Sequence, residues 1–335
     1  MKRNKLIVLI LSLVTTLALL VGCASNSGGS TGNGEKNTGG SEAKDGKIVI
    51  GAAMPVFDDK WLSYLYDAIK AYDEEHDDVE VIMVDAKNDV GKQLSQVETF
   101  VSQKVNAIMT VPVDTDSIDP ILDTANAANI PVVVVNRNPS EQAMEKAYAY
   151  VGSESLEAGT MQMEKVAELL GGKGNIGIMN GTLGHESATK RTEGNKNVIA
   201  QHPEMKLVRE QTADYQRATG LTLMENWIQS GDKLDAIVAN NDEMAIGAIM
   251  ALEAAGQLEG KVIAGIDGTM DALEYVRQGK LQVTVFQNAN GQGKTGVETA
   301  VKAARGETLD DKYVWVPFEL VTKDNVEEYV KKWQE

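Results

Sequence analysis

The chain has 335 residues, 43% of them apolar, and its 32 Lys and Arg against 49 Asp and Glu give a formal net charge of −17. This composition suits one large or two ordinary domains and excludes a disordered chain. The negative charge repels phosphate, so we expect no nucleic-acid partner and favour an uncharged small molecule. The single cysteine, Cys23, excludes an intramolecular disulfide and a thiolate zinc cluster, and no cofactor or metal is expected.

The first residues have the layout of a secretory signal. A cationic stretch at 1–5 precedes an uncharged apolar run at 6–22, which is marginal against the roughly 20 apolar residues of a permanent membrane span. The run ends in Leu20-Val21-Gly22-Cys23, which resembles the lipobox of bacterial lipoproteins. We therefore expect residues 1–22 to be a lipoprotein signal peptide and Cys23 to carry acyl chains, palmitate among them, that anchor the protein outside the cytoplasm. The alternative is an ordinary secreted protein with a stray cysteine.

Residues 24–46 are rich in glycine and contain no aliphatic side chain larger than that of alanine. Such a segment cannot bury a core, so residues 23–46 are expected to form a flexible tether with a reach of about 25 Å. The folded protein should begin near Lys47.

Short apolar runs of strand length recur along the rest of the chain. They lie at 48–50, 79–84, 107–111, 132–135, 148–151, 176–179, 236–238, 262–266 and 283–286. The stretches between them show helical spacing, as at Trp61, Leu65 and Ile69. This alternation predicts an α/β fold with parallel sheets covered by helices on both faces, and the pattern restarts after Val151. We therefore expect two similar doubly wound lobes.

Polar residues stand directly after several of these runs. They are Asn136 and Arg137, Asn241 and Asp242, Asp267, and Gln287. Ligands bind outside the carboxyl ends of parallel strands, so these side chains are candidates for a binding site. For Asp242, capping of the following helix is the favoured alternative.

The chemistry of these side chains suits a neutral polyol. Planar carboxylate, amide and guanidinium groups can each engage neighbouring hydroxyls, while an aromatic ring can cover the CH face of a sugar. Trp61 and Tyr215 are the stacking candidates, although Trp61 could instead begin the buried face of its helix.

Several segments together resemble the ribose-binding branch of the solute-binding proteins of bacterial sugar transporters. They are 130–137, 241–248, 265–269 and 293–300, and the resemblance covers nearly everything after Lys47. It implies a periplasmic binding protein of type I, with two lobes joined by a three-crossover hinge that closes on a sugar. The lobes would be 47–152 plus 288–316 and 153–287 plus 317–335.

Residue by residue, the resemblance also implies a binding site. The polar contacts would be Asp59, Asn136, Arg137, Arg191, Asn241, Asp267 and Gln287, and the aromatic positions fall on Trp61, Leu62 and Tyr215. Ribose binders carry a second aromatic where Leu62 stands and an aspartate where Asn136 stands. Segment 57–62 looks more like that of inositol-binding relatives. We therefore favour a cyclitol such as myo-inositol over ribose, with galactose, xylose or allose left open.

The arginines of this site need compensating charges if they are buried. Asp59 and Asp267 are the expected partners of Arg137 and Arg191. Arginine neighbours would hold both carboxylates ionised and leave no general acid, which argues against a glycan-processing enzyme. Some transcriptional repressors share this pair of lobes, but they need a basic helix-turn-helix at the N-terminus. Here that place is taken by the predicted signal and tether, which argues against a regulator.

The expected function is a monomeric, non-enzymatic binding protein that delivers its ligand to the membrane subunits of an ABC importer. A ribose or other aldose binder that also serves a chemoreceptor is the alternative.

Overall fold

The computed structural model describes residues 46–333. The predicted signal peptide, the lipidated Cys23 and nearly all of the predicted tether lie outside the described residues. Among the helices of the described part, none is both long enough and apolar enough to span a bilayer.

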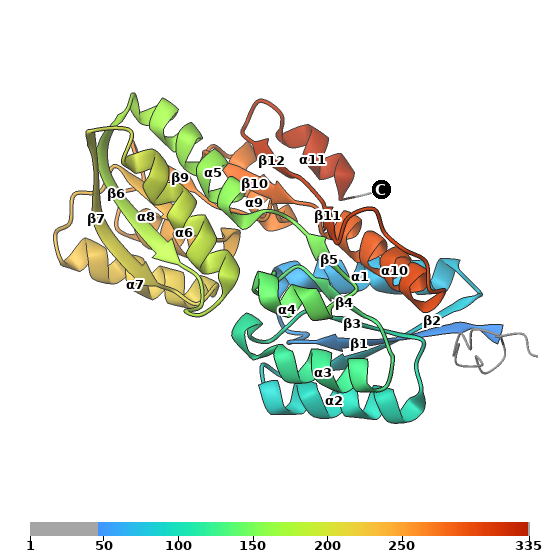
Figure 1. Cartoon of the computed structure of the whole chain (residues 1–335). Coiled ribbons are helices and arrows are strands. Elements are labelled where there is room, and N and C mark those ends of the chain that lie inside the picture. Colours follow the sequence, from blue (N-terminus) through green and yellow to red (C-terminus); the bar gives the residue numbers. More distant parts are fainter. Residues whose placement is uncertain (1–45, 334–335) are drawn as a thin grey trace, which may run out of the picture. The chain divides into compact units, whose positions relative to one another are not determined.

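The first sheet is wholly parallel and lies in the N-terminal lobe (Figure 1). Its order is β11-β5-β4-β3-β1-β2, with bounds Tyr313–Trp315, Ala149–Gly152, Val132–Val135, Ala107–Thr110, Ile48–Met54 and Val79–Asp85. Helices α1 (Lys60–Glu75) and α10 (Ala289–Ala304) cover one face, while α2 (Val90–Gln103), α3 (Asp119–Ala127) and α4 (Glu141–Lys146) cover the other. A 3₁₀ turn, η2 (Thr115–Ser117), precedes α3.

Strand β4 consists entirely of valine, and its position in the sheet gives the reason. Val133 and Val135 pack into the core beneath α1 and α10, while Val132 and Val134 pack into the core on the opposite face. Successive side chains of a strand point to opposite faces, so a strand covered on both sides needs apolar residues at every position.

The second sheet is also parallel and lies in the C-terminal lobe. Its order is β7-β6-β8-β9, with bounds Glu204–Thr212, Lys173–Asn180, Ala236–Ala239 and Val262–Ala264. Isolated bridges bring β10 (Thr284–Gln287) alongside β9, and β10 pairs antiparallel with β12 (Phe318–Val321). The helices of this lobe are α5 (Ser155–Leu170), α6 (Glu186–Ile199), α7 (Arg217–Gln229), α8 (Asp242–Ala254), α9 (Met270–Arg277) and α11 (Val326–Lys332).

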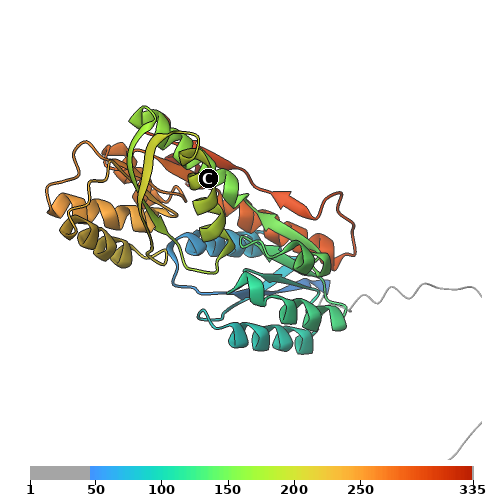
Figure 2. The same cartoon turned by 60° about the vertical axis from the view of Figure 1, so that its left-hand side comes forward.

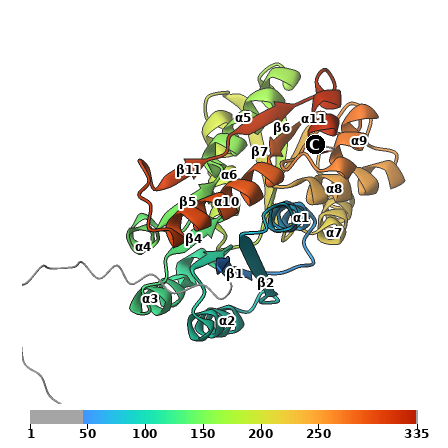
Figure 3. The same cartoon turned by 90° about the vertical axis from the view of Figure 1, so that its right-hand side faces the viewer.

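The chain crosses between the two sheets after β5, after β10 and after β11. Figures 1 and 2 show the green segment after β5 and the red segment around β11 running beside each other, and Val316 N donates to Gly152 O at 2.7 Å. This is the predicted α/β architecture of two parallel-sheet lobes, while the residue limits of each lobe remain a prediction. Figure 3 shows α1 next to α10, the helix that follows the second crossing.

A close approach of two helices places one of the predicted site residues. A Cβ atom added to Gly159 on α5 would lie 2.0 Å from the carbonyl oxygen of Arg191 on α6. On the other helix, Gly194 faces the carbonyl oxygen of Leu156, which a Cβ would meet at 2.5 Å. The two glycines therefore let α5 and α6 pack backbone against backbone, and α6 carries Arg191.

Candidate ligand-binding site

Every predicted ligand-binding residue lines one pocket, to which both lobes contribute. The lining residues are Asp59, Trp61, Leu62, Asn136, Arg137, His185, Ser187, Arg191, Tyr215, Asn241, Asp267 and Gln287. His185 and Ser187 are the two that the sequence analysis missed. Ser187 stands four residues before Arg191 on α6, so helical spacing could have pointed to it.

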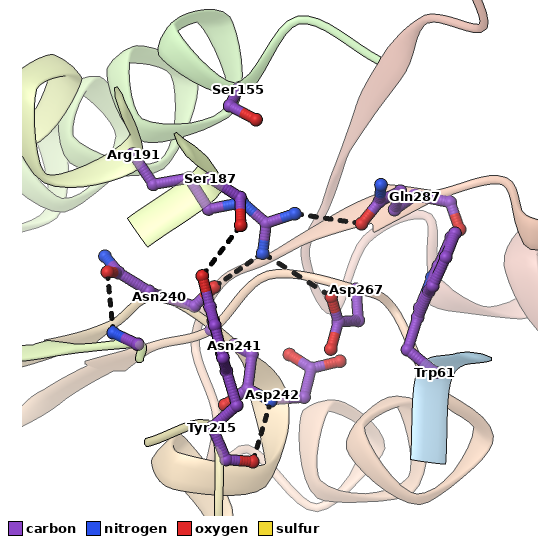
Figure 4. Close-up of polar contacts among 12 residues, drawn as sticks. Trp61, Ser155, Ser187, Arg191, Tyr215, Asn240, Asn241, Asp242, Asp267 and Gln287 are labelled. Carbon is purple, nitrogen blue, oxygen red and sulfur yellow. Dashed lines mark hydrogen bonds and ion pairs between the residues drawn. The ribbon is translucent and has the colours of Figure 1, made fainter. Parts of the chain in front are cut away.

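Helix α1 presents the first two site residues. Asp59 is its N-cap, with Oδ1 accepting a hydrogen bond from Leu62 N at 2.9 Å, which fixes the carboxylate at the helix start. Trp61 is 6% exposed, lies in the hydrophobic core and donates from Nε1 to Gln287 O at 3.1 Å. Trp61 therefore begins the buried face of its helix and also lines the pocket, while stacking of its indole on a ligand stays a prediction (Figure 4).

Arg137 is buried, but the expected pairing with Asp59 is wrong. Its Nη1 donates to Pro112 O at 2.8 Å and to Val113 O at 3.1 Å, and no carboxylate of the described residues lies within ion-pair distance. Backbone carbonyls after β3 hold the guanidinium in place of a carboxylate. Burial lowers the pKa of Arg137, and the negative charge of Asp59 acts in the opposite direction.

Arg191 does pair with Asp267, as expected. Nη1 lies 3.7 Å from Asp267 Oδ1 and donates to Asn240 O at 2.7 Å, while Nη2 donates to Gln287 Oε1 at 2.9 Å (Figure 4). Its Nε is buried and has no partner within residues 46–333.

The expectation that arginine holds the site carboxylates ionised is wrong for Asp267. Burial raises the pKa of Asp267 well above its usual value, and the charge of Arg191 offsets this only in part. The long contact of 3.7 Å explains the outcome, because a buried carboxylate needs close pairing to offset its lost hydration.

Three residues of the pocket have strained backbone. Asn136, Tyr215 and Asp267 have φ of +67°, +61° and +131°, in a region that side chains other than glycine seldom adopt. Neighbouring bonds hold them there; for Asn136, Tyr150 Oη donates to its carbonyl at 2.7 Å. Such strain is typical of binding sites, where it aims a side chain that relaxed backbone would direct elsewhere.

Asn241, and not Asp242, caps helix α8, so the capping interpretation of Asp242 is wrong. Asn241 Oδ1 accepts from Met244 N at 3.0 Å, and its Nδ2 donates to Tyr215 O at 3.2 Å. Asp242 is fully buried and accepts from Thr284 Oγ1 at 2.7 Å and Thr269 N at 2.9 Å. Its carboxylate thus ties the segment after β9, which carries Asp267, to strand β10, which carries Gln287.

Tyr215 is held in place by two residues at the start of α6, the N-cap His185 and Ser187. Its hydroxyl lies 2.8 Å from Ser187 Oγ, and its ring packs against that of His185 with centroids 6.0 Å apart and planes 26° apart. Burial and the charge of Arg137 lower the pKa of His185 from 6.5 to about 4, so its imidazole is neutral at physiological pH.

A larger hollow of about 450 Å³ shares Asp59, Arg137, His185 and Tyr215 with the pocket, and we call it the mouth. It is further lined by the carboxylates of Asp58, Asp114, Asp116 and Asp214. Within the described chain, none of these four carboxylates forms an ion pair, so the mouth carries uncompensated negative charge. The described residues contain no cluster of His, Cys, Asp and Glu suited to a metal ion.

Two parallel-sheet lobes with polar and aromatic side chains from both gathered in one pocket define a solute-binding protein. A family model described as a periplasmic binding protein domain matches residues 50–308, so the chain belongs to that family. Proteins of this family work outside the cytoplasm.

Individual relatives agree with this assignment. A Rhizobium meliloti protein named as rhizopine-binding is 44% identical over 287 residues, covering 84% of this chain and 93% of the relative. The ribose import binding protein of Bacillus subtilis (strain 168) is 34% identical, covering 73% and 78%. A solved solute-binding protein of an ABC transporter from Bacillus halodurans, with bound myo-inositol, is 49% identical with a TM-score of 0.82, covering 86% and 99%. The chain is thus a sugar-binding protein of ABC transport and not an enzyme.

Proposed function

We propose that this protein captures a cyclitol, with myo-inositol as the favoured ligand, and delivers it to the membrane subunits of an ABC importer. The observation that carries the proposal is the lining of the pocket, which combines Leu62 and Asn136 with two aromatic rings and two arginines. The structural relative with bound myo-inositol and the relative named as rhizopine-binding support it.

The donors and acceptors of the pocket match a ring whose every carbon carries a hydroxyl. Arg191 Nε is a buried donor that the described chain leaves unused, and Asp267 and Asn241 offer acceptor oxygens nearby. Trp61 from the N-terminal lobe and Tyr215 from the C-terminal lobe would cover the CH faces of the ring. Hydrogen bonds to charged groups contribute roughly 1.5–3 kcal/mol each, so a few of them support micromolar binding, about −8 kcal/mol.

The charges favour a neutral ligand. Both pocket arginines already donate to oxygens of the protein, and His185 is uncharged, so the described lining leaves no unpartnered cation for a phosphate or carboxylate. The acidic mouth adds repulsion against any anion that approaches.

Delivery follows from closure of the lobes. Ligand contacts made by both lobes stabilise the closed state over the open one, and closure brings surfaces of both lobes into a fixed arrangement for docking. We further propose that the protein acts as a monomer held at the cell membrane by lipidated Cys23.

Ribose is the second candidate, favoured by the 34% identity to a ribose import binding protein. Calorimetric titration of the full chain with myo-inositol, ribose, galactose, xylose and allose separates the candidates. We expect micromolar or tighter binding of myo-inositol and at least tenfold weaker binding of ribose. Tighter binding of ribose than of myo-inositol would overturn the cyclitol assignment.

A further inference from the structure

His185 lies on the boundary between the pocket and its mouth, because it is a lining residue of both. It belongs to the segment 181–185, which connects β6 to α6 and which the sequence analysis did not include in the site. A ligand held in the pocket would therefore present one edge to this imidazole and, beyond it, to the acidic mouth.

Packing against Tyr215 accounts for a ring at position 185 but not for the two nitrogens of an imidazole. His185 occupies the N-cap position of α6, but its side chain makes no capping bond. Its Nδ1 is buried and finds no hydrogen-bond partner anywhere in the part of the chain that the structure describes. Leaving a buried ring nitrogen unpaired costs free energy, so an unpaired nitrogen in a residue that lines the pocket indicates a partner that arrives with the ligand.

The neighbours of the ring keep it in position. The ring packs against Tyr215, and Tyr215 is fixed by Ser187 through the 2.8 Å contact between their hydroxyls. The imidazole is neutral, so one nitrogen can donate and the other can accept.

We infer that His185 is a specificity-determining residue, whose imidazole exchanges a hydrogen bond with the ligand hydroxyl that faces the mouth. This inference rests on the proposed function. It follows that the protein distinguishes cyclitols by the substituent at one ring position, because a ring that lacks this hydroxyl leaves the imidazole unpaired.

The test compares His185→Phe with the unchanged full chain by calorimetric titration. The ligands are myo-inositol and the series of inositols that each lack one hydroxyl. Phenylalanine keeps the ring that packs against Tyr215 and removes both nitrogens. We expect His185→Phe to bind myo-inositol roughly tenfold more weakly than the unchanged protein does. The two proteins should have equal affinity for one deoxy-inositol only, the one that lacks the hydroxyl facing the mouth.

His202→Phe is the matched control, because it makes the same change on a residue outside the pocket lining, and it should bind every ligand normally. If His185→Phe does not fold, His185→Leu takes its place. Equal affinity of the variant and the unchanged protein for every ligand would overturn the inference. An equal loss for every ligand would also overturn it, since that would indicate packing and not recognition of one hydroxyl.

The outcome also separates the inference from the proposed function. If the unchanged protein binds ribose and not myo-inositol, the proposed function fails. The same comparison then runs with ribose and its singly deoxygenated analogues. If His185→Phe then binds every analogue but one more weakly than the unchanged protein does, the result would still support the role of His185.

Discussion

Gly159→Ala is expected to weaken ligand binding although the change is made on α5, a helix behind the site. The new Cβ would lie 2.0 Å from Arg191 O, about 1 Å closer than packed atoms tolerate, so α5 and α6 must move apart. Overpacking of this kind costs about 1–3 kcal/mol of unfolding free energy. The shift also moves the Arg191 side chain, whose bonds to Asn240 O and Gln287 Oε1 measure 2.7 and 2.9 Å.

Urea unfolding and calorimetric titration of the full chain measure the two effects. Gly91→Ala is the matched control, because Gly91 is exposed on α2 and the nearest atom to its added Cβ is Asp89 Oδ1 at 3.3 Å. Alanine is favoured over glycine by roughly 0.5–1 kcal/mol inside a helix, so the control should be neutral or stabilising. If Gly159→Ala retained the stability and the affinity of the unchanged protein, helix spacing would not position Arg191 and the reasoning would fail.

Three further perturbations test the site. Asp267→Ala should abolish measurable binding while the chain still folds, because it removes the carboxylate beside Arg191; calorimetric titration measures the loss. Asp242→Asn should flatten the pH dependence of stability between about pH 4 and pH 7. Burial raises the pKa of Asp242 from 3.8 to about 7, so its contribution is fully present at low pH and is lost as the pH rises through the folded value; urea unfolding at several pH values measures this. A myo-inositol monophosphate should compete at least tenfold more weakly than myo-inositol, because the mouth carries unpaired carboxylates; a competition titration measures this.

Asp267→Ala has a matched control, and each of the three tests has a contradicting result. Asp232→Ala breaks an ion pair with Arg209 outside the pocket lining and should leave affinity unchanged. Normal binding by Asp267→Ala would remove that carboxylate from the site. An unchanged pH slope in Asp242→Asn would show that this carboxylate is ionised in the fold. If the myo-inositol monophosphate competed as strongly as myo-inositol, the result would contradict the charge argument.

The sequence was informative where burial leaves a simple pattern. The all-valine strand β4 and the helical spacing of Trp61, Leu65 and Ile69 are consequences of elements packed on both faces, and the structure confirms both. The polar residues that follow the strands converge because parallel strands end at one edge of a sheet.

Other elements left no such pattern. Strand β7 lies at the edge of its sheet and is largely exposed, so it contains charged residues and lacks an apolar run. Strands β11 and β12 are only partly buried and also lack a continuous apolar run. The carbonyls that hold Arg137 belong to the backbone, which a sequence does not describe. Asn241 and Asp242 are both good helix caps, and only the buried threonines around Asp242 decide between them.

Gln287 makes two contacts with different parts of the molecule. Its side-chain oxygen accepts from Arg191 in the pocket, its carbonyl accepts from Trp61 of the N-terminal lobe, and the chain crosses between the lobes immediately after it. A contact inside the pocket and a crossing between the lobes therefore meet at one residue. On the proposed function, we expect a substitution of Gln287 to change both how tightly the solute is held and how readily it is released, which would link retention to turnover in the transport cycle.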